Sequence, residues 1–299
     1  MREELREGVA YVLRRVRFPR RSRVIDAVEA ALGEKRGSSV VPLRHGGRIL
    51  ADCPADKKLF YTGEHEWRVL HFLLRTAKAN HTVFDVGANL GAYTIPLALK
   101  VGPGGRVCAF EASKVNYEIL VRNIRLNTLT NVTPVYGAVA ATTGTLEAPE
   151  AAERKHNLGN YSLADESPRR VVIPSWSLDD FALQHGIRTI DLLKVDVEGA
   201  EVLAMRGARR LFREGRVRTV CCEFAPERLS SMGASTEELY ELFEEYGMSA
   251  AFELTLLSRL RPIDKKFLQR ASSQIDTVLY FHERRQPDRP LIQNAEVNS

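Results

Sequence analysis

The chain has 299 residues, of which 44% are hydrophobic and 27% charged, the ordinary composition of a soluble globular protein. No run of 18 apolar residues occurs and the charged N-terminus lacks an apolar core, so neither a transmembrane helix nor a secretory signal is expected. The whole net charge of +5 lies in residues 1–25, which contain eight Arg and three Glu. The spacing of the four cysteines fits neither a metal motif nor a disulfide framework, so we expect buried reduced thiols and a cytoplasmic protein. They are Cys53, Cys108, Cys221 and Cys222.

In chain order, residues 1–80 are expected to form a helical and mixed cap that ends in an amphipathic helix over 66–77. From residue 82, strands and helices alternate. Strands are expected at 82–87, 106–112, 132–140, 189–197, 216–224 and 275–282, with short extended pieces at 143–148 and 169–178. Helices are expected at 113–127, 199–212 and 235–247. Pro96 would kink the helix after the first strand or delay its start. The alternation favours a mostly parallel sheet with helices on both faces over 81–283, followed by a disordered tail at 284–299.

A glycine turn follows the first expected strand, in the stretch VFDVGANLGAYT at 83–94. Asp85 ends the strand, and Gly87, Asn89 and Gly91 form the turn. About twenty residues later Glu111 ends the next strand, where an acid can accept hydrogen bonds from both hydroxyls of a ribose. This combination predicts a site for an adenosine-containing ligand at the carboxyl ends of the strands.

The details of the turn favour S-adenosylmethionine over other nucleotide ligands. A dinucleotide fingerprint requires G-x-G-x-x-G, and Asn89 occupies the middle glycine position. A phosphate-binding G-x-x-x-x-G-K-[ST] loop does not occur in the sequence. An acid before the turn suits the α-amino group of S-adenosylmethionine, and backbone N–H groups suit its carboxylate. The alternative is a scaffold whose glycines only tighten a turn.

A second charged cluster, LLKVDVEGAE, follows the strand at 189–197. Asp196 lies at the strand end, and Glu223 ends the expected strand at 216–224. If the two strands are neighbours, their carboxylates converge, and such a pair can deprotonate a hydroxyl or bind a divalent cation. No spacing in the sequence demands a metal. Glu198 and Glu201 are equally well explained as surface acids or helix caps.

The sequence resembles the FkbM-type family of S-adenosylmethionine-dependent methyltransferases. The resemblance is carried by FDVGANLGAYT, FEAS, NIRLNTLTNV, SLDDF, IDLLKVDVEGAEV and CEF, in that order, over about residues 80–225. YTGEHE at 61–66 is also similar, whereas Ala112 departs from the proline that the family commonly has after the glutamate. The resemblance implies a class I methyltransferase fold with a seven-stranded sheet. It also implies methyl transfer to a hydroxyl of a sugar, a glycan or a secondary metabolite.

The resemblance further implies roles for individual residues. The expected cofactor-binding residues are Asp85, Gly87, Asn89, Gly91, Glu111, Ala138 and Asp196. Asp196 is the first candidate for the catalytic base, alone or through a cation shared with Glu223, and His65 and His156 are the alternatives. The segment KHNLGNYS at 155–162 is expected to face the acceptor.

Two other functions remain open on the sequence. One is methyl transfer to a protein or nucleic acid, and the other is a noncatalytic adenosyl-binding scaffold in a glycan assembly complex. The arginine run could contact an anionic surface, although without aromatic platforms it does not favour nucleic acid, and a solvated helix end explains it as well. Its members are Arg14, Arg15, Arg17, Arg20, Arg21 and Arg23.

Overall fold

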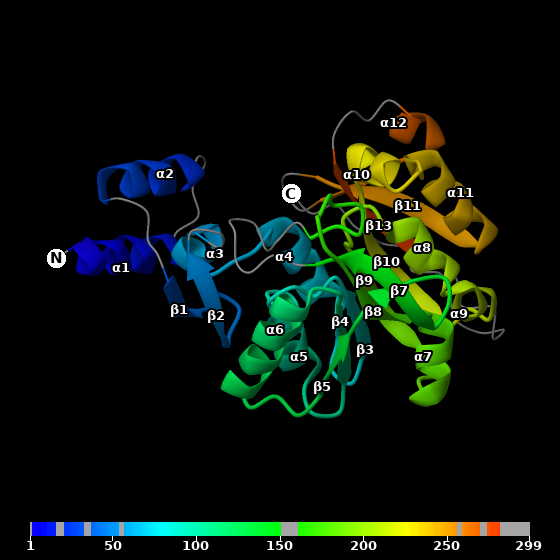
Figure 1. The fold of residues 1–299 in the computed structure, drawn as a ribbon, viewed down its shortest axis with the longest axis horizontal. Coiled ribbons are helices and arrows are strands. Elements are labelled where there is room, and N and C mark those ends of the chain that lie inside the picture. Colours follow the sequence, from blue (N-terminus) through cyan, green and yellow to red (C-terminus); the bar gives the residue numbers. More distant parts are fainter. Residues whose placement is uncertain are drawn as a thin grey trace, which may run out of the picture.

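The computed structural model describes residues 2–15, 21–32, 37–53, 57–150, 161–255, 259–269 and 274–281. Its centre is an eight-stranded sheet in the order β12-β11-β13-β10-β9-β3-β4-β5 (Figure 1). These strands are β3 (Thr82–Val86), β4 (Arg106–Glu111), β5 (Val132–Tyr136), β9 (Ile190–Val195), β10 (Val217–Phe224), β11 (Met248–Leu254), β12 (Leu260–Pro262) and β13 (Ile275–Phe281). The five strands from β5 to β10 are parallel, and β13 is antiparallel to both β10 and β11. The expected mostly parallel sheet is confirmed, and the short edge strand β12 adds an eighth strand to the seven expected.

Helices cover both faces of this sheet, as the alternating sequence predicts. One face packs against α4 (Trp67–Thr76), α5 (Thr94–Val101) and α6 (Lys114–Leu126). The opposite face packs against α7 (Leu178–Gln184), α8 (Glu201–Arg206), α9 (Arg209–Arg213), α10 (Pro226–Ser231), α11 (Thr236–Glu245) and α12 (Lys265–Gln269). Cys221 and Cys222 lie in the two different cores, which is the expected result of strand alternation. Pro96 lies in the first turn of α5, where its missing N–H leaves no helical hydrogen bond unmade.

Two expected elements are each divided in the structure. The strand expected at 132–140 stops at Gly137, whose φ of +131° turns the chain, and β6 (Ala138–Val139) joins a second sheet. That sheet has the order β6-β8-β7, with β7 (Gly144–Pro149) antiparallel to β8 (Arg170–Trp176). The helix expected at 199–212 breaks between α8 and α9. The Gly207 carbonyl there accepts hydrogen bonds from the Asp179 N–H and the Ser177 hydroxyl instead of from the next helical turn.

The N-terminal cap consists of α1 (Arg2–Leu13), α2 (Arg21–Leu32), the hairpin β1 (Gly37–Pro42)–β2 (Arg48–Cys53), and α3 (Lys57–Thr62), which leads into α4. Its apolar core includes Ile95 of α5 and Ile119 of α6, so the cap packs on the main sheet through these helices. Asn123 of α6 fixes the hairpin, because its Oδ1 accepts from the Leu50 N–H at 2.6 Å. In the described part of the chain, none of the helices has the length and apolarity needed to cross a membrane.

Candidate functional site

The glycine turn joins β3 to the start of α5 at the carboxyl edge of the sheet. The N–H groups of Gly87 and Ala88 both donate to the Phe110 carbonyl of β4, which holds the turn beside the neighbouring strand. Gly87 has a φ of +78°, and a Cβ at this position would overlap the Asp196 carbonyl oxygen. The glycine is therefore required for the close approach of β3 and β9, in addition to any contact with a ligand.

Glu111 ends β4 on the opposite side of the turn and is buried. Its two carboxylate oxygens accept from the backbone N–H groups of Asn89 and Ser113, each at 2.8 Å. Burial raises the pKa of Glu111 to about 7, and these two hydrogen bonds oppose that shift. The carboxylate is thus oriented by the turn, and each oxygen keeps capacity to accept from a hydroxyl.

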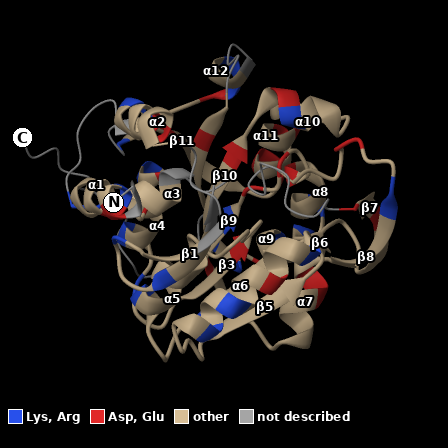
Figure 2. Cartoon of the chain, turned by 60° about the vertical axis from the view of Figure 1, so that its left-hand side comes forward, with Lys and Arg blue, Asp and Glu red and all other residues tan. Residues whose placement is uncertain are grey.

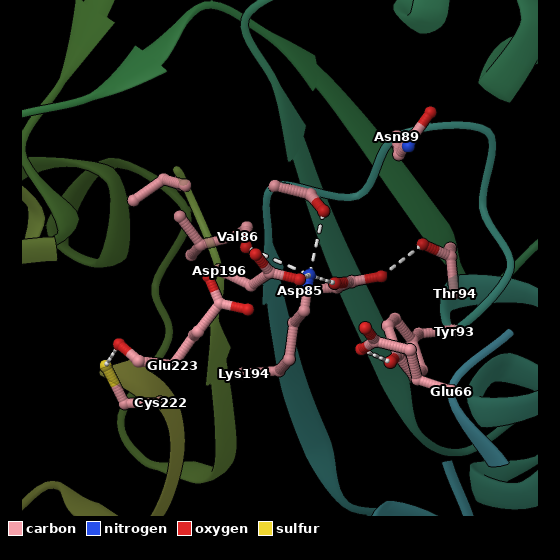
Figure 3. Close-up of polar contacts among 12 residues, drawn as sticks. Glu66, Asp85, Val86, Asn89, Tyr93, Thr94, Lys194, Asp196, Cys222 and Glu223 are labelled. Carbon is pink, nitrogen blue, oxygen red and sulfur yellow. Dashed lines mark hydrogen bonds and ion pairs between the residues drawn. The ribbon is translucent and has the colours of Figure 1, made fainter. Parts of the chain in front are cut away.

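Asp85 is fully buried and does not line the cavity beside the turn. Its Oδ2 accepts from the Thr94 hydroxyl at 2.6 Å, and its Oδ1 lies 3.4 Å from Nζ of Lys194. Figure 3 shows the Lys194 ammonium between Asp85 and Asp196. The sequence predicts that Asp85 faces the ammonium of a cofactor, whereas in the structure the charge that faces Asp85 belongs to Lys194.

Asp196 follows β9 and lines the cavity, and its Oδ2 lies 3.5 Å from Nζ of Lys194. Strands β9 and β10 are parallel neighbours, so the condition for convergence of Asp196 and Glu223 is met. Burial and then the charge of Asp196 raise the pKa of Glu223 well above its ordinary value, and Gln274 donates to its Oε1. The raised pKa favours the protonated form of Glu223, and in that form the carboxyl cannot act as a base.

The other acids of the second cluster serve local structure. The Glu201 carboxylate accepts from the N–H groups of Val197 and Gly199 and so closes the turn after β9. Strand β9 ends at Val195, so the side chain of Glu198 does not continue the strand pattern. Glu198 has a φ of +53° and forms an ion pair with Arg228 at 3.1 Å. Among the residues that the structure describes, no group of three or more His, Cys, Asp or Glu side chains is arranged to hold a metal ion.

The cap contributes one wall of the cavity. Leu59 of α3 and His65, in the connection to α4, both line it. The His65 ring packs edge-on against Tyr93 with ring centroids 5.5 Å apart, and the Tyr93 hydroxyl donates to Glu66 at 2.7 Å. Of the two alternative bases, His65 is thus at the cavity, whereas His156 lies outside the described residues.

The predicted arginine run is only partly within the described residues, since Arg17 and Arg20 lie outside them. Arg14 is mostly buried and donates two hydrogen bonds to the Phe60 carbonyl, and Arg15 stacks on Tyr11 at 3.4 Å. Arg23 is exposed on α2. Figure 2 shows both signs of charge on α1 and α2. Arg14 therefore has a structural role in the cap, and contact of the others with an anionic surface stays a prediction.

The cavity fits the adenosyl ligand that the sequence predicts. It is lined by Gly87, Asn89 and Glu111 beyond β3 and β4, by Ala138 of β6 and by Asp196 beyond β9. Oδ1 of Asn89 is buried without a hydrogen-bond partner among the described residues, so it is available to a donor on a ligand. Gly91 is outside the lining and faces Leu120 of α6, which makes its role one of shaping the turn.

Lys194 and Tyr93 have clear places in the site and were not assigned a role from the sequence, whereas Tyr161 belongs to the segment at 155–162 that is expected to face the acceptor. Lys194 is the buried cation, Tyr93 packs over it with 5.1 Å from Nζ to the ring centroid, and Tyr161 lines the cavity. The sequence could have indicated the role of Lys194, because a lysine inside an apolar strand needs a carboxylate partner when it is buried. Tyr93 carries no such signal, since an aromatic residue at such a position is usually core.

The sequence profile of the methyltransferase FkbM domain matches residues 85–249, just over half of the chain. The methyltransferase sdnD of Sordaria araneosa is 29% identical over 158 residues, covering 43% of this chain and 61% of that protein, so the chain spans about three fifths of this curated relative. Among solved structures, an FkbM methyltransferase from Methylobacillus flagellatus is 18% identical with a TM-score of 0.45, covering 76% of this chain and 53% of that one. A TehB-like SAM-dependent methyltransferase from Corynebacterium glutamicum is 13% identical with a TM-score of 0.43, covering 76% and 94%. With its class I sheet and the profile match across the glycine turn and both acidic strand ends, the chain belongs to the FkbM family of S-adenosylmethionine-dependent methyltransferases.

Proposed function

We propose that this protein transfers a methyl group from S-adenosylmethionine to a hydroxyl of a sugar, a glycan or a secondary metabolite. The observation that carries the proposal is the cavity at the carboxyl edge of the sheet. There, the buried acceptor Glu111 and the free amide oxygen of Asn89 lie opposite the carboxylate of Asp196. One side of this cavity suits a nucleoside, and the other carries an acid that can accept a proton.

Some residues of the cavity serve to bind the cofactor, and others serve to accept the proton during methyl transfer. When bound, S-adenosylmethionine supplies an electrophilic methyl group on a positively charged sulfur. Glu111 would accept hydrogen bonds from the ribose hydroxyls, and the turn at 87–91 would hold the cofactor. Asp196 would accept the proton of the acceptor hydroxyl while the methyl group leaves the sulfur for the hydroxyl oxygen, with S-adenosylhomocysteine as the leaving group. His65, at the cap wall of the cavity, is the alternative proton acceptor.

Binding of S-adenosylhomocysteine, measured by calorimetric titration with NAD as the control ligand, tests the cofactor half of the proposal. We expect saturable binding of S-adenosylhomocysteine, no binding of NAD, and a loss of about tenfold or more in Glu111→Ala. Glu118→Ala is the matched control, because Glu118 is a half-exposed residue of α6 that pairs with Lys114. Absence of binding by the wild type, or equal binding by Glu111→Ala, would overturn the cofactor assignment.

Formation of S-adenosylhomocysteine in the presence of hydroxyl compounds, beginning with sugars, tests the catalytic half. Asp196→Asn is expected to lose turnover while it still binds the cofactor product. Full turnover by Asp196→Asn together with its loss in His65→Gln would assign the base to His65. Cofactor binding without turnover across sugar, protein and nucleic-acid acceptors would instead support the scaffold function.

A further inference from the structure

Lys194 has the most constrained position of any charged side chain described near the cavity. It projects from the end of β9 with 2% of its surface exposed. Its ammonium donates to the Gly87 carbonyl at 2.8 Å and to the Val86 carbonyl at 3.3 Å, and it forms ion pairs with Asp85 and Asp196 (Figure 3). The glycine turn, β3 and β9 are therefore connected through a single buried cation.

The two acids that flank this cation differ in their access to the cavity. Asp85 has no exposed surface, and its other carboxylate oxygen is occupied by the Thr94 hydroxyl. Asp196 is 25% exposed and lines the cavity. A positively charged group that enters the cavity thus meets Asp196, while Lys194 separates it from Asp85.

The charges of Lys194, Asp85 and Asp196 agree with this difference in access to the cavity. Burial opposes the charged form of Lys194, but Asp196 and Asp85 outweigh it and raise the pKa of the lysine above its ordinary value. One cation between two carboxylates leaves one negative charge. Because Asp196 is the carboxylate that lines the cavity, a ligand meets this negative charge at Asp196.

We propose that Asp85 is the fixed counter-ion of Lys194 and does not contact the cofactor, so that both residues act as positioning residues for the Gly87 turn and for Asp196. This inference rests on the proposed function for the identity of the cofactor. It replaces the role that the sequence motif suggests for Asp85, because the acid before the turn serves the protein's own ammonium and not the ammonium of the ligand.

The proposal is tested by the binding of two ligands, S-adenosylhomocysteine and its analogue that lacks the α-amino group, to the wild type and to Asp85→Asn. If Asp85 acts through Lys194, the substitution weakens both ligands by the same factor, because the missing amino group is not its partner. If Asp85 binds the ligand ammonium, the substitution weakens S-adenosylhomocysteine by more than about tenfold beyond its effect on the analogue, and the proposal is overturned. Failure of the wild type to bind S-adenosylhomocysteine would instead refute the proposed function.

Substitutions of Lys194 provide a second test of the proposal. Lys194→Arg keeps the cation and is expected to retain more affinity for S-adenosylhomocysteine than Lys194→Met, which leaves two carboxylates without their partner. Asp85→Asn added to Lys194→Met should recover thermal stability relative to Lys194→Met alone, because it removes one of the two carboxylates that have lost their cation. If Lys194→Met does not fold, the double variant and Lys194→Arg carry the same comparison. Affinity of Lys194→Met equal to that of the wild type would contradict the positioning role.

Discussion

Two buried polar clusters, one in the cap and one at the edge of the main sheet, are built from similar side chains and differ in what surrounds them. In the cap, Arg6 of α1 pairs with Glu29 of α2 at 3.3 Å, and Tyr61 of α3 donates to the same carboxylate. In the site, Lys194 lies between Asp85 and Asp196. The cap cluster joins three helices and is enclosed by apolar residues, whereas the site cluster has one carboxylate in a cavity.

The difference shows that buried charge alone does not identify a functional site. Arg6 and Glu29 are 4% and 7% exposed, values close to the 3% of the Lys194 side chain. Each cluster connects segments far apart in the sequence, and each is expected to stabilise the fold only while it is complete. The site cluster differs from the cap cluster in its access to the cavity, because the partly exposed Asp196 lines that cavity. This access, and not the buried charge, indicates function.

The largest effect is expected from Gly87→Ala, which tests the close packing of the site cluster. The added Cβ would overlap the Asp196 carbonyl, so β3 and β9 must separate, and we expect a loss of more than about 4 kcal/mol of unfolding free energy together with cofactor binding. Gly102→Ala is the matched control. Gly102 also has a positive φ, of +69°, but nothing lies within 4 Å of its Cβ position, so strain alone should cost about 1–2 kcal/mol. Equal losses in urea denaturation would show that the contact with Asp196 is unimportant.

Arg6→Met is expected to break the cap cluster without changing the site. It removes the Arg6 guanidinium from the buried Glu29 carboxylate, which should cost about 3 kcal/mol in urea denaturation. The affinity of the folded variant for S-adenosylhomocysteine should stay within about twofold of the wild type, because no cap cluster residue lines the cavity. Arg15→Met, in the exposed turn that follows the same helix, is the control with a loss below about 0.5 kcal/mol. A parallel fall of affinity and stability would show that the cap cluster belongs to the site.

The contrast between the clusters also explains how much the sequence could predict. The strand, turn and acid at 82–111 follow from local pattern, and the meeting of Asp196 with Glu223 follows from the parallel order of the sheet. The pairing of Asp85 with Lys194 could not be predicted, because Lys194 lies 109 residues further along the chain. The glycine-turn motif specifies the acid but not the residue that it contacts. The cap was predicted only as helical and mixed. Its core depends on contacts between α1, α2 and α3, which no local periodicity in residues 1–62 reveals.

A smaller effect is expected where the cap meets the sheet layer, at Asn123. Its amide accepts from the Leu50 N–H and donates to the Leu90 carbonyl at 2.9 Å, and it is fully buried. Asn123→Ala leaves these backbone groups without partners and should cost about 2 kcal/mol. Asn127→Ala, one turn later and half-buried against Arg48, should cost less than about 1 kcal/mol. Hydrogen exchange at the Leu50 amide is the direct measurement, and unchanged protection in Asn123→Ala would contradict the role of this contact.

The smallest effect is the pH dependence that Glu111 imposes on the site. The ligand-free protein holds this carboxyl at a pKa of about 7, against an ordinary value of 4.5, because it is buried. Between these two values the folded state binds more protons than the unfolded state, so the Glu111 contribution to stability falls as pH rises from 4.5 to 7. The affinity for S-adenosylhomocysteine should change in the opposite direction, since ribose hydroxyls donate to the ionised carboxylate.

We therefore expect the dissociation constant to rise by up to about fivefold between pH 7 and pH 6 and to be nearly constant above pH 8. Glu198 and Asp276 also have pKa values raised to about 7, mainly by burial, so the Glu111 contribution is the difference between the wild type and Glu111→Gln. Glu111→Gln should bind weakly with little dependence on pH, and calorimetry in buffers of different ionisation enthalpy should show proton release in the wild type alone at pH 6.5. Equal proton release in the variant would assign the linkage to another group with a raised pKa, such as Glu198 or Asp276, and would show that Glu111 is not the pH-sensitive group of the site.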